Sequence, residues 1–213
     1  MGGSKGSTKV GPTLKEETLF DGPTIEVARR LVGAALIRKL PPEHEDAGEE
    51  LLGRIVETEA YLPFVDPACH GFRGPTPRNT SIFGRPGHAY VYFIYGNHFC
   101  LNVTTECAGI GGAVLIRALE PLSGIEAMRR RRPGVRDAQL LSGPGNICKV
   151  MSIDRSCDGA DLSRSASLRI ETARSRRNGM KIAATTRVGL RVAAGWPLRF
   201  YDSSSESVSK KPR

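Results

Sequence analysis

Four strand-like runs follow one another between residues 51 and 119 with no long helical segment between them, and this succession constrains the fold most. They are rich in β-branched and aromatic residues and are separated by segments that contain Gly, Pro, Asn or Asp. The runs are Leu51–Tyr61, Ala89–Tyr95, Phe99–Thr105 and Ala113–Leu119. Parallel strands need a long crossover connection, usually a helix. The pattern therefore predicts an antiparallel or mixed sheet rather than a doubly wound parallel one.

Helical and further strand-like segments flank these runs. Apolar residues recur at helical spacing over Thr24–Leu40, although Leu36–Leu40 fits a strand equally well. Helices are also predicted at Ser123–Arg131, which Pro133-Gly134 ends, and around Ile147–Met151. Later strands are predicted at Leu168–Glu171, Arg187–Val192 and Leu198–Tyr201. Strands outnumber helices, so the predicted fold class is mixed α/β (α+β), one sheet with surrounding helices.

The length of 213 residues suits one large domain better than two. We expect a flexible basic N-terminal arm over residues 1–13, which are rich in Gly and Ser, and a flexible polar C-terminal tail over 203–213. The folded domain is then expected to span residues 14–202. No run of apolar residues reaches membrane-spanning length, so we expect no membrane partner.

Charge and cysteine content narrow the class of partner. The formal net charge of +9 and the pI of about 9.6 favour an anionic partner, of which nucleic acid is the commonest. The five cysteines form no C-x-x-C pair, which argues against a zinc knuckle or a disulfide framework and favours a reducing compartment. No H-E-x-x-H, Walker A or G-x-S-x-G motif occurs, so we expect neither a metal nor a cofactor.

Two carboxylates share one predicted strand. Alternation places Ile55, Glu57, Glu59 and Tyr61 on one face, with successive side chains about 7 Å apart. A carboxylate beside an aromatic ring is partly desolvated, which suits it to removing a proton from water. The alternative is an edge strand with one face toward solvent, and the pattern by itself does not say which carboxylate would act.

An aromatic hairpin is predicted where Gly96-Asn97 separates two apolar runs, with a two-residue type I′ or II′ turn. Tyr95 then lies next to the turn, where a large ring finds little to pack against. On a basic protein such a ring can act as a wedge between base steps. Alternatively, Tyr95 folds back onto an ordinary core hairpin.

Two further positions suit contacts with phosphate groups. Pro75-Thr76-Pro77-Arg78-Asn79 forms a rigid loop that carries a cation and several hydrogen-bonding groups, or is simply a surface loop. Arg117 follows the apolar residues Val114-Leu115-Ile116, where a charge needs an anionic partner. That partner is either a carboxylate in a structural ion pair or a phosphate.

A series of motifs, in order and at compatible spacing from about Phe20 to Tyr201, resembles the alkyladenine (3-methyladenine) DNA glycosylase family, also called the N-methylpurine DNA glycosylases. The motifs are Glu57-Thr58-Glu59-Ala60-Tyr61, His70, Thr76-Pro77-Arg78-Asn79, Pro86-Gly87, Tyr90-Val91-Tyr92, Tyr95-Gly96, Phe99-Cys100-Leu101-Asn102, Ile116-Arg117-Ala118-Leu119-Glu120-Pro121, Ser142-Gly143-Pro144, Arg187-Val188-Gly189 and Pro197-Leu198-Arg199-Phe200-Tyr201. The resemblance implies a single mixed α/β domain with a curved antiparallel sheet, similar to the C-terminal domain of formyltransferases.

The resemblance also implies roles for individual residues around a flipped base. Glu59 corresponds to the general base that holds the water attacking the sugar C1′. Tyr61 corresponds to the ring beneath the flipped base, and His70 and Tyr92 complete the stacking and hydrogen-bonding pocket. Asn102 corresponds to the side chain that disfavours the exocyclic amine of normal guanine.

Other residues correspond to positions that contact the duplex. Tyr95 matches the wedge that fills the gap left by the flipped nucleotide. Arg117 matches a phosphate contact near that nucleotide, and Thr76 and Arg78 match backbone contacts. Asn97 and His98 depart from the family pattern, in which a bulkier apolar residue and an aromatic residue are common.

The implied function is base-excision repair of double-stranded DNA by a monofunctional, cofactor-free and metal-free enzyme that acts as a monomer. It would flip alkylated or deaminated purines (3-methyladenine, 7-methylguanine, hypoxanthine, ethenoadenine) out of the duplex. Hydrolysis of the N-glycosidic bond by water would then leave an abasic site. The expected location is the nucleus in a eukaryote, or the cytoplasm and nucleoid in a bacterium.

Two other function classes fit parts of the sequence. A metal-dependent nuclease could use Glu57, Glu59 and Asp66 as ligands, and a non-catalytic module could recognise distorted duplexes. One geometrical point is also open. Simple pairing about Gly96-Asn97 sets Tyr92 opposite Leu101 and places Asn102 on the other face, so a shared pocket needs a bulge or a strong twist.

Overall fold

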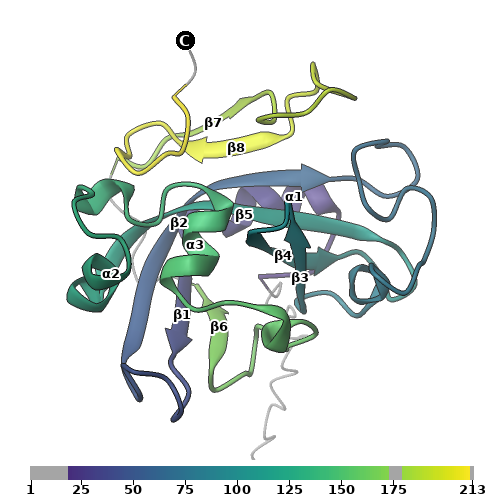
Figure 1. Cartoon of the computed structure of the whole chain (residues 1–213). Coiled ribbons are helices and arrows are strands. Elements are labelled where there is room, and N and C mark those ends of the chain that lie inside the picture. The colour runs from purple at the N-terminus through teal and green to yellow at the C-terminus, as the bar shows by residue number, and fades with distance from the viewer. Residues whose placement is uncertain (1–18, 173–178, 212–213) are drawn as a thin grey trace, which may run out of the picture.

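Strand β2 (Glu50–Tyr61) lies at the centre of the fold in the computed structural model, which describes residues 19–172 and 179–211. One edge of β2 pairs with β5 (Gly112–Ser123) over almost its whole length. The other edge is shared, because β1 (Ala35–Lys39) pairs with its first part and β8 (Arg199–Asp202) with residues 57–59. The sheet therefore divides along β2, and β7 and β8 lie apart from β1 and β6 in Figure 1.

Every pairing in the described sheet is antiparallel, and the strand order is β3-β4-β5-β2-β1-β6, with β8 joined to β2 and β7 joined to β8. The remaining strands are β3 (Ala89–Ile94), β4 (His98–Thr105), β6 (Leu168–Glu171) and β7 (Ile182–Thr185). This curled antiparallel sheet confirms the predicted fold class.

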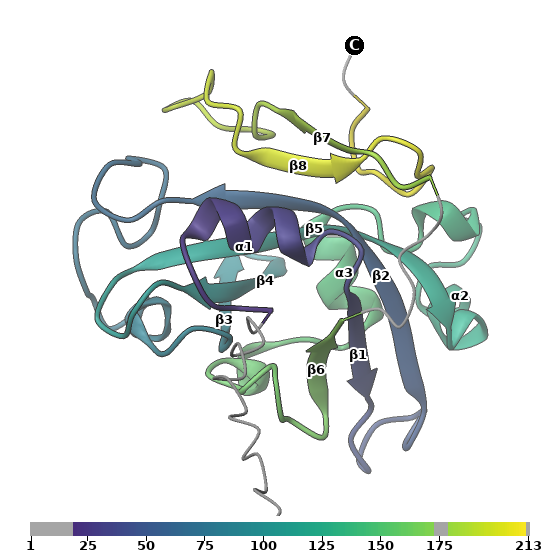
Figure 2. The same ribbon diagram turned by 180° about the vertical axis from the view of Figure 1, so that it is seen from behind.

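Helices cover both faces of the sheet. Helix α1 (Thr24–Leu31) lies on one face and packs against β2 and β5, whereas α3 (Pro144–Val150) lies on the other face with α2 (Ile125–Arg131) beside it (Figures 1 and 2). Val27, Ala28 and Leu31 of α1 are fully buried in the core. The short 3₁₀ turns are η1 (Thr80–Phe83), η2 (Asp137–Gln139) and η3 (Arg155–Cys157).

The helix predicted over Thr24–Leu40 is wrong in its second half. The helix ends at Leu31, and Gly33 adopts a φ of +97°, a left-handed conformation that suits glycine. Gly33 donates its N–H to the Ile55 carbonyl, which turns the chain onto the edge of β2. Ala35–Lys39 then pairs with both β2 and β6, so the strand alternative for this segment is confirmed.

The strand predicted at Arg187–Val192 is also wrong. The partner of β8 is β7, whose residues 182–185 precede that segment. Residues 187–192 instead form bends, because their polar groups are engaged with the end of β2. Arg187 binds Asp66 and the Ala60 carbonyl, and Val188 donates its N–H to Glu59. The Val188 N–H is therefore not available for a strand ladder.

The C-terminal segment packs onto the sheet instead of forming the flexible tail that we expected over 203–213. Ser205, Ser207 and Val208 are buried, and Ser209 hydrogen-bonds to Glu57. These contacts supply polar partners to Glu57, a buried residue of β2, which explains why so polar a stretch packs against the sheet. The arm predicted over 1–13 lies outside the described residues. In the part of the chain that the structure describes, no helix has the length and apolar character needed to cross a membrane.

Candidate active site

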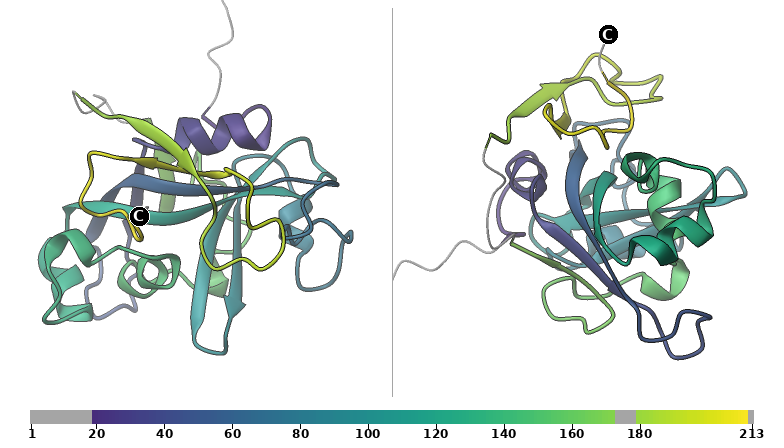
Figure 3. Two further views of the ribbon diagram at one scale, coloured as in Figure 1. Left: turned by 90° about the horizontal axis from the view of Figure 1, so that it is seen from above. Right: turned by 90° about the vertical axis from the view of Figure 1, so that its left-hand side faces the viewer.

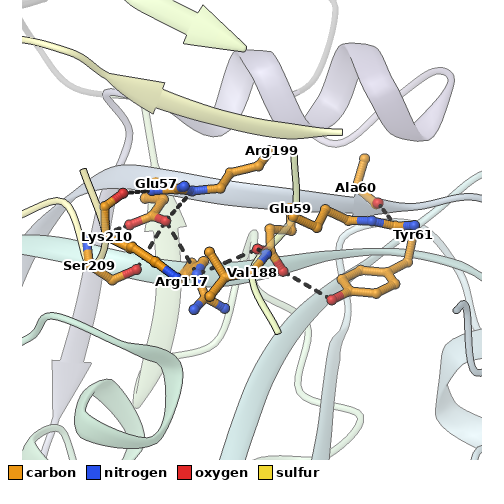
Figure 4. Close-up of polar contacts among 10 residues, drawn as sticks. Glu57, Glu59, Ala60, Tyr61, Arg117, Val188, Arg199, Ser209 and Lys210 are labelled. Carbon is orange, nitrogen blue, oxygen red and sulfur yellow. Dashed lines mark hydrogen bonds and ion pairs between the residues drawn. The ribbon is translucent and has the colours of Figure 1, made fainter. Parts of the chain in front are cut away.

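An irregularity in the pairing of β2 with β5 creates the polar site. The ladder skips Val56 on β2 and Arg117 on β5, so each strand carries one extra residue there. Extra residues of this kind locally re-aim the side chains of a strand. Here Glu57 and Glu59 come together around Arg117 (Figure 4). Ile55, which simple alternation places with the two carboxylates, lies in the hydrophobic core instead.

Arg117 forms an ion pair with both carboxylates. Its Nε lies 3.2 Å from Oε1 of Glu57 and 3.4 Å from Oε1 of Glu59. Of the two alternatives for Arg117, the structure shows the structural ion pair. The side chain retains 13% exposure and lines a cleft beside the site, so its guanidinium also faces the space that a ligand would enter. Its predicted contact with a phosphate stays a prediction.

Glu59 is fully buried and is held at both carboxylate oxygens. Oε1 accepts a hydrogen bond from the Val188 N–H at 2.7 Å, and Oε2 accepts one from the Tyr61 hydroxyl at 2.9 Å (Figure 4). Val188, Tyr61 and Arg117 all line the same cleft. Glu59 therefore lies directly beneath the cleft wall, in a fixed orientation.

Glu57 has a different set of partners, although it is equally buried. Oε1 accepts from Arg199 Nε at 2.5 Å and from the Ser209 hydroxyl at 3.0 Å, and Oε2 accepts from the Ser209 N–H at 2.6 Å. These partners belong to β8 and the C-terminal segment, and neither Arg199 nor Ser209 lines the cleft. The structure thus separates two carboxylates that the sequence pattern left equivalent: Glu59 adjoins the cleft and Glu57 anchors the sheet.

The hairpin turn differs from the prediction. Tyr95 and Gly96 have φ values of +55° and +73°, and Asn97 donates its N–H to the Ile94 carbonyl, so Tyr95-Gly96 are the central residues of a type I′ turn. Pairing resumes between Ile94 and His98, which leaves Asn97 as one extra residue. The proposed two-residue turn at Gly96-Asn97 is therefore wrong, because positive φ falls one residue earlier.

Because the turn lies one residue earlier than predicted, the register of β3 with β4 also differs by one residue. Tyr92 pairs with Cys100 and Tyr90 with Asn102, so Tyr90, Tyr92 and Asn102 all face the same side. The bulge that the other register required within the strands is not needed. Tyr95 remains at the tip, 85% exposed, and the hairpin (teal) projects from the rest of the domain in the left view of Figure 3.

Aromatic rings line a small pocket next to the carboxylates. The His70 ring lies 4.5 Å from the Tyr92 ring and 6.0 Å from the Tyr90 ring, centre to centre, in edge-on arrangements. His70 Nδ1 and the Tyr90 hydroxyl share a hydrogen bond of 2.9 Å. Asn102 donates its amide to the Tyr90 carbonyl at 3.0 Å. Tyr61 completes the wall, so the four predicted pocket residues do line one pocket.

Burial sets the charge state of the pocket. Desolvation against its aromatic neighbours lowers the pKa of His70, although the residue as a whole stays at the exposed mouth of the pocket. Desolvation raises the pKa of Tyr61, and the neighbouring Glu59 carboxylate raises it further. Desolvation likewise raises the pKa of Tyr92. At neutral pH these three rings are therefore uncharged.

A cleft of about 330 Å³ lies beside this pocket and is lined by Arg117 of the ion-pair cluster. Tyr61, Ala68, His70 and Tyr92 line both spaces. Tyr95 of the hairpin tip also lines the cleft, as do Arg117 and Val188. The pocket and the cleft thus share part of their wall, and the cleft is also lined by residues that contact Glu59.

Thr76 and Arg78 lie on an exposed loop beside the pocket. Asn79 organises this loop: its side-chain oxygen accepts from the Thr76 N–H and hydroxyl, and its amide donates to the His70 and Gly74 carbonyls. Thr76 and Arg78 line a groove of about 290 Å³ that also reaches His70. The structure thus places both residues beside the pocket mouth, and their contact with DNA stays a prediction.

Three residues that matter for the geometry were not among the predicted site residues. Tyr90 lies two positions before Tyr92, so strand alternation alone could have identified it as part of the pocket wall. Arg187 and Val188 lie more than a hundred residues from Glu59 along the chain. The only signal for them was the match of Arg187-Val188-Gly189 to the family motif.

The carboxylates that a metal-dependent nuclease would use as ligands already have arginine partners in the structure. Glu57 and Glu59 face Arg117, and Asp66 is held by both terminal nitrogens of Arg187. A divalent cation would have to displace these guanidinium groups to reach the carboxylates. The arrangement therefore favours acid–base chemistry over metal ligation at this site.

A buried carboxylate beneath a cleft walled by aromatic rings is the arrangement of a hydrolase that accepts a planar group. Comparison with known proteins agrees, since the model of the family described as methylpurine-DNA glycosylase matches residues 18–206. The chain belongs to the methylpurine-DNA glycosylase family. It is a DNA glycosylase, an enzyme of DNA repair whose partner is DNA.

Individual relatives support the same assignment. The human and mouse proteins named DNA-3-methyladenine glycosylase are 42% and 41% identical to this chain over 89% and 95% of its length. The chain spans 66% of the human and 62% of the mouse relative. A relative from Methanocella arvoryzae is 48% identical over 90% of this chain and 94% of its own length.

Proposed function

We propose that this enzyme removes alkylated or deaminated purines from duplex DNA by flipping the damaged nucleotide into the aromatic pocket, where Glu59 activates the attacking water. The observation that carries the proposal is the position of Glu59. It is buried, and three residues that contact it (Tyr61, Arg117 and Val188) line the cleft that shares a wall with the pocket.

In the proposed reaction the water oxygen bonds to C1′ of the flipped nucleotide while the C1′–N bond to the purine breaks. The bonding electrons leave with the purine, and Glu59 accepts a proton from the water. A purine that carries a positive charge from alkylation departs as a neutral base, so modest help from a general base is sufficient. The products are the free base and an abasic site in an unbroken strand. No lysine amine takes part, so no covalent intermediate with the DNA forms.

The pocket supports recognition of such purines. Stacking a base on an aromatic ring contributes about 1–3 kcal/mol, which offsets the few kcal/mol needed to unstack and extrude it. Cationic purines gain further from cation–π attraction to the faces of Tyr61 and Tyr92. The neutral state of His70 avoids repulsion of such a cation. Asn102, on the pocket wall, would meet the exocyclic amine of a normal guanine and oppose its entry.

The surroundings of the cleft support the duplex contacts. Tyr95 is exposed at the projecting tip of the hairpin and lines the cleft, which suits it to fill the gap in the base stack. Arg117 also lines the cleft and would meet the phosphate of the flipped nucleotide. Thr76 and Arg78 border the groove beside the pocket mouth and would contact the backbone further along.

A release assay on defined duplexes tests the proposal. Duplexes that each carry one 3-methyladenine analogue, 7-methylguanine, hypoxanthine or ethenoadenine are incubated with excess enzyme in the presence of a chelator, and free base and strand integrity are measured. We expect release of free base from unbroken strands, and a loss of about 10²–10⁴-fold in Glu59→Gln with lesion binding retained. Release by Glu59→Gln at the wild-type rate would show the proposed mechanism to be wrong.

A further inference from the structure

Arg187 and Asp66 form an ion pair with fully buried side chains at the end of β2. Arg187 NH2 donates to Oδ1 of Asp66 at 2.9 Å, and NH1 contacts Oδ2, so the guanidinium binds the carboxylate with both terminal nitrogens. NH1 also donates to the Ala60 carbonyl at 2.9 Å. Planar, two-point pairing of this kind fixes the orientation of the guanidinium.

The pair lies behind the tyrosine ring of the pocket. The guanidinium carbon of Arg187 lies 4.6 Å from the centre of the Tyr61 ring and covers one face of it. That ring lines the base pocket and donates its hydroxyl to Glu59. The orientation of Arg187 therefore fixes a ring that touches both the pocket and the proposed general base.

Each partner of the pair also organises a neighbouring segment. Asp66 accepts from the Leu62 N–H at 3.3 Å and from the Ala68 N–H at 3.0 Å, which shapes the loop that leads to His70. On the other side, the residue that follows Arg187 is Val188, whose N–H donates to Glu59 at 2.7 Å. One buried ion pair thus joins the end of β2, the loop before His70 and the segment at Val188.

We propose that the Arg187–Asp66 pair is a positioning element for catalysis, which sets the Tyr61 ring and holds the Val188 N–H on Glu59. The inference rests on the proposed function, because it gives Tyr61 and Glu59 their roles in the reaction. A buried ion pair is weak evidence for stability, since well-packed apolar residues of similar volume often serve a fold equally well. The contacts of this pair with the Tyr61 ring and with the segment at Val188 are what an apolar replacement could not supply.

Arg187→Lys tests the proposal because it keeps the positive charge opposite Asp66 and removes the planar, two-point contact. The matched control is Arg131→Lys. Arg131 is also a largely buried arginine, paired with Asp46 at 2.7 Å, and its other contacts are His44 and the Val150 carbonyl, outside the site. Both substitutions replace a largely buried, paired guanidinium with an ammonium, so the control accounts for effects of reduced stability, whereas the planar, two-point contact is lost only at Arg187.

Two readouts separate positioning from stability. Single-turnover release of ethenoadenine from a duplex should slow by about 10–100-fold in Arg187→Lys, with half-saturation by lesion duplex unchanged, because small displacements of catalytic groups cost rates of this size. Arg131→Lys should release base at the wild-type rate. Amide hydrogen exchange at Val188, followed by NMR without DNA, should accelerate in Arg187→Lys and remain at the wild-type rate in Arg131→Lys.

The outcomes distinguish this inference from the proposed function. If Val188 exchange in Arg187→Lys equals that in Arg131→Lys, the pair does not position the segment and the inference is overturned, whatever the activity. If exchange accelerates and excision slows only in Arg187→Lys, the inference is supported. Failure of the proposed function is seen separately, as undiminished release by Glu59→Gln. Asp66→Asn should act like Arg187→Lys, and the double variant should lose no more than either single variant, because both act through one contact.

Discussion

Tyr61 donates its hydroxyl hydrogen bond to Glu59 over 2.9 Å, although the two residues follow each other on the same face of one strand. The same tyrosine ring lines the base pocket and is backed by the Arg187 guanidinium. The group proposed to stack on the base and the group proposed to activate water are therefore mechanically linked. This link makes it possible to separate the two contributions of Tyr61 by substitution.

Tyr61→Phe should impair chemistry and preserve recognition. The substitution keeps the ring and removes only the hydrogen bond to the buried carboxylate of Glu59. Hydrogen bonds to charged groups contribute about 1.5–3 kcal/mol, so the single-turnover excision rate should fall by about 10–100-fold. Binding to a lesion duplex, measured with the Glu59→Gln background to prevent turnover, should stay within error of the parent. Weaker binding of the lesion duplex with an unchanged excision rate would contradict this assignment of the hydroxyl to chemistry and the ring to recognition.

Tyr61→Ala should lose both contributions. Without the ring, the stacking energy of about 1–3 kcal/mol per base is removed together with the hydrogen bond. Arg187 also loses the ring that it covers, which exposes the buried ion pair to the pocket. We expect weaker lesion binding and a slower rate than in Tyr61→Phe, measured by titration and single-turnover kinetics on the same duplex. Equal binding by the alanine and phenylalanine variants would show that the ring does not stack on the base.

Tyr95→Gly should stabilise the protein and impair excision from duplex DNA. Tyr95 has a φ of +55°, a conformation that costs an L-residue about 1–2 kcal/mol and costs glycine very little. The substitution should therefore raise the thermal midpoint by about 2–4 °C per kcal/mol of relieved strain. Excision from a duplex should slow, because no ring fills the vacated stack.

A single-stranded substrate provides the control for Tyr95. Such a strand leaves no paired gap to fill, so the wild type and Tyr95→Gly should release a damaged base from it at equal rates. Equal rates on duplex DNA as well would exclude a wedge role. The retention of a strained, exposed tyrosine at a position that glycine fits better is itself what points to function at the hairpin tip.

Local patterns in the sequence predicted most of the sheet, but not its irregularities. Alternation correctly grouped Glu57, Glu59 and Tyr61, since each contacts or adjoins the same cluster, whereas the four pocket residues were indicated only by the family resemblance. Alternation within β2 did not predict the extra residue at Val56, which interrupts the pairing of β2 with β5. Bulges depend on how two distant strands meet, and a pattern within one strand does not record that.

The composition likewise did not determine which two residues form the hairpin turn. Gly96 favoured a turn in this region, but Gly96-Asn97 and Tyr95-Gly96 both contain the residue that tolerates positive φ. The structure uses Tyr95-Gly96, which moved the register by one residue and brought Asn102 to the side of Tyr92. Asn tolerates positive φ better than Tyr, so the sequence predicted the turn at Gly96-Asn97.

The choice between Glu57 and Glu59 depends on contacts over long sequence separations. Glu59 accepts a hydrogen bond from the Val188 N–H, 129 residues away, and Glu57 accepts one from the Ser209 N–H, 152 residues away. Only the family resemblance selected Glu59 from the sequence. The packing of residues 203–211 could not be predicted from local patterns for the same reason, since Ser209 donates to the carboxylate of Glu57 in the middle of the sheet.

Removal of the C-terminal segment should therefore destabilise the sheet. A chain that ends at Glu206 lacks the Ser209 donors to Glu57 and the Lys210 carbonyl that accepts from Arg199. Although Glu57 keeps Arg117 and Arg199, the loss of hydrogen bonds to charged groups costs about 1.5–3 kcal/mol each, so the free energy of unfolding in urea should fall by about this amount or more. Ser209→Ala, which removes only the hydroxyl donor, should lose about 0.5–1.5 kcal/mol.

The matched truncation ends at residue 211 and keeps all of these contacts. Its unfolding free energy and excision rate should equal those of the whole chain. The shorter chain should also lose excision activity beyond its loss of stability, because Glu57 and Glu59 share Arg117. If the chain ending at Glu206 unfolds at the same urea concentration as the whole chain, the C-terminal segment does not serve as an anchor for Glu57.

Protonation of His70 should make the recognition of charged lesions depend on pH. Desolvation lowers the pKa of His70 below its ordinary value of about 6.5. As the pH falls, the unfolded chain takes up this proton first. The stability contributed by neutral His70 is therefore fully present above the unfolded pKa and is lost as the pH falls through the folded pKa. In that same window the ring in the pocket becomes a cation.

A cationic ring beside Tyr92 repels a purine that already carries a positive charge. Binding of a 7-methylguanine duplex to the Glu59→Gln variant should therefore weaken as the pH falls through the folded pKa of His70. Binding of a hypoxanthine duplex, whose lesion is neutral, should weaken less. The two affinities are measured by fluorescence anisotropy across this range at constant ionic strength, because phosphate contacts respond to salt.

His70→Asn should remove the difference in pH dependence between the two lesions, since its amide does not titrate. Parallel pH dependence for both lesions in the chain that retains His70 would show that the charge of this ring plays no part in selecting the base.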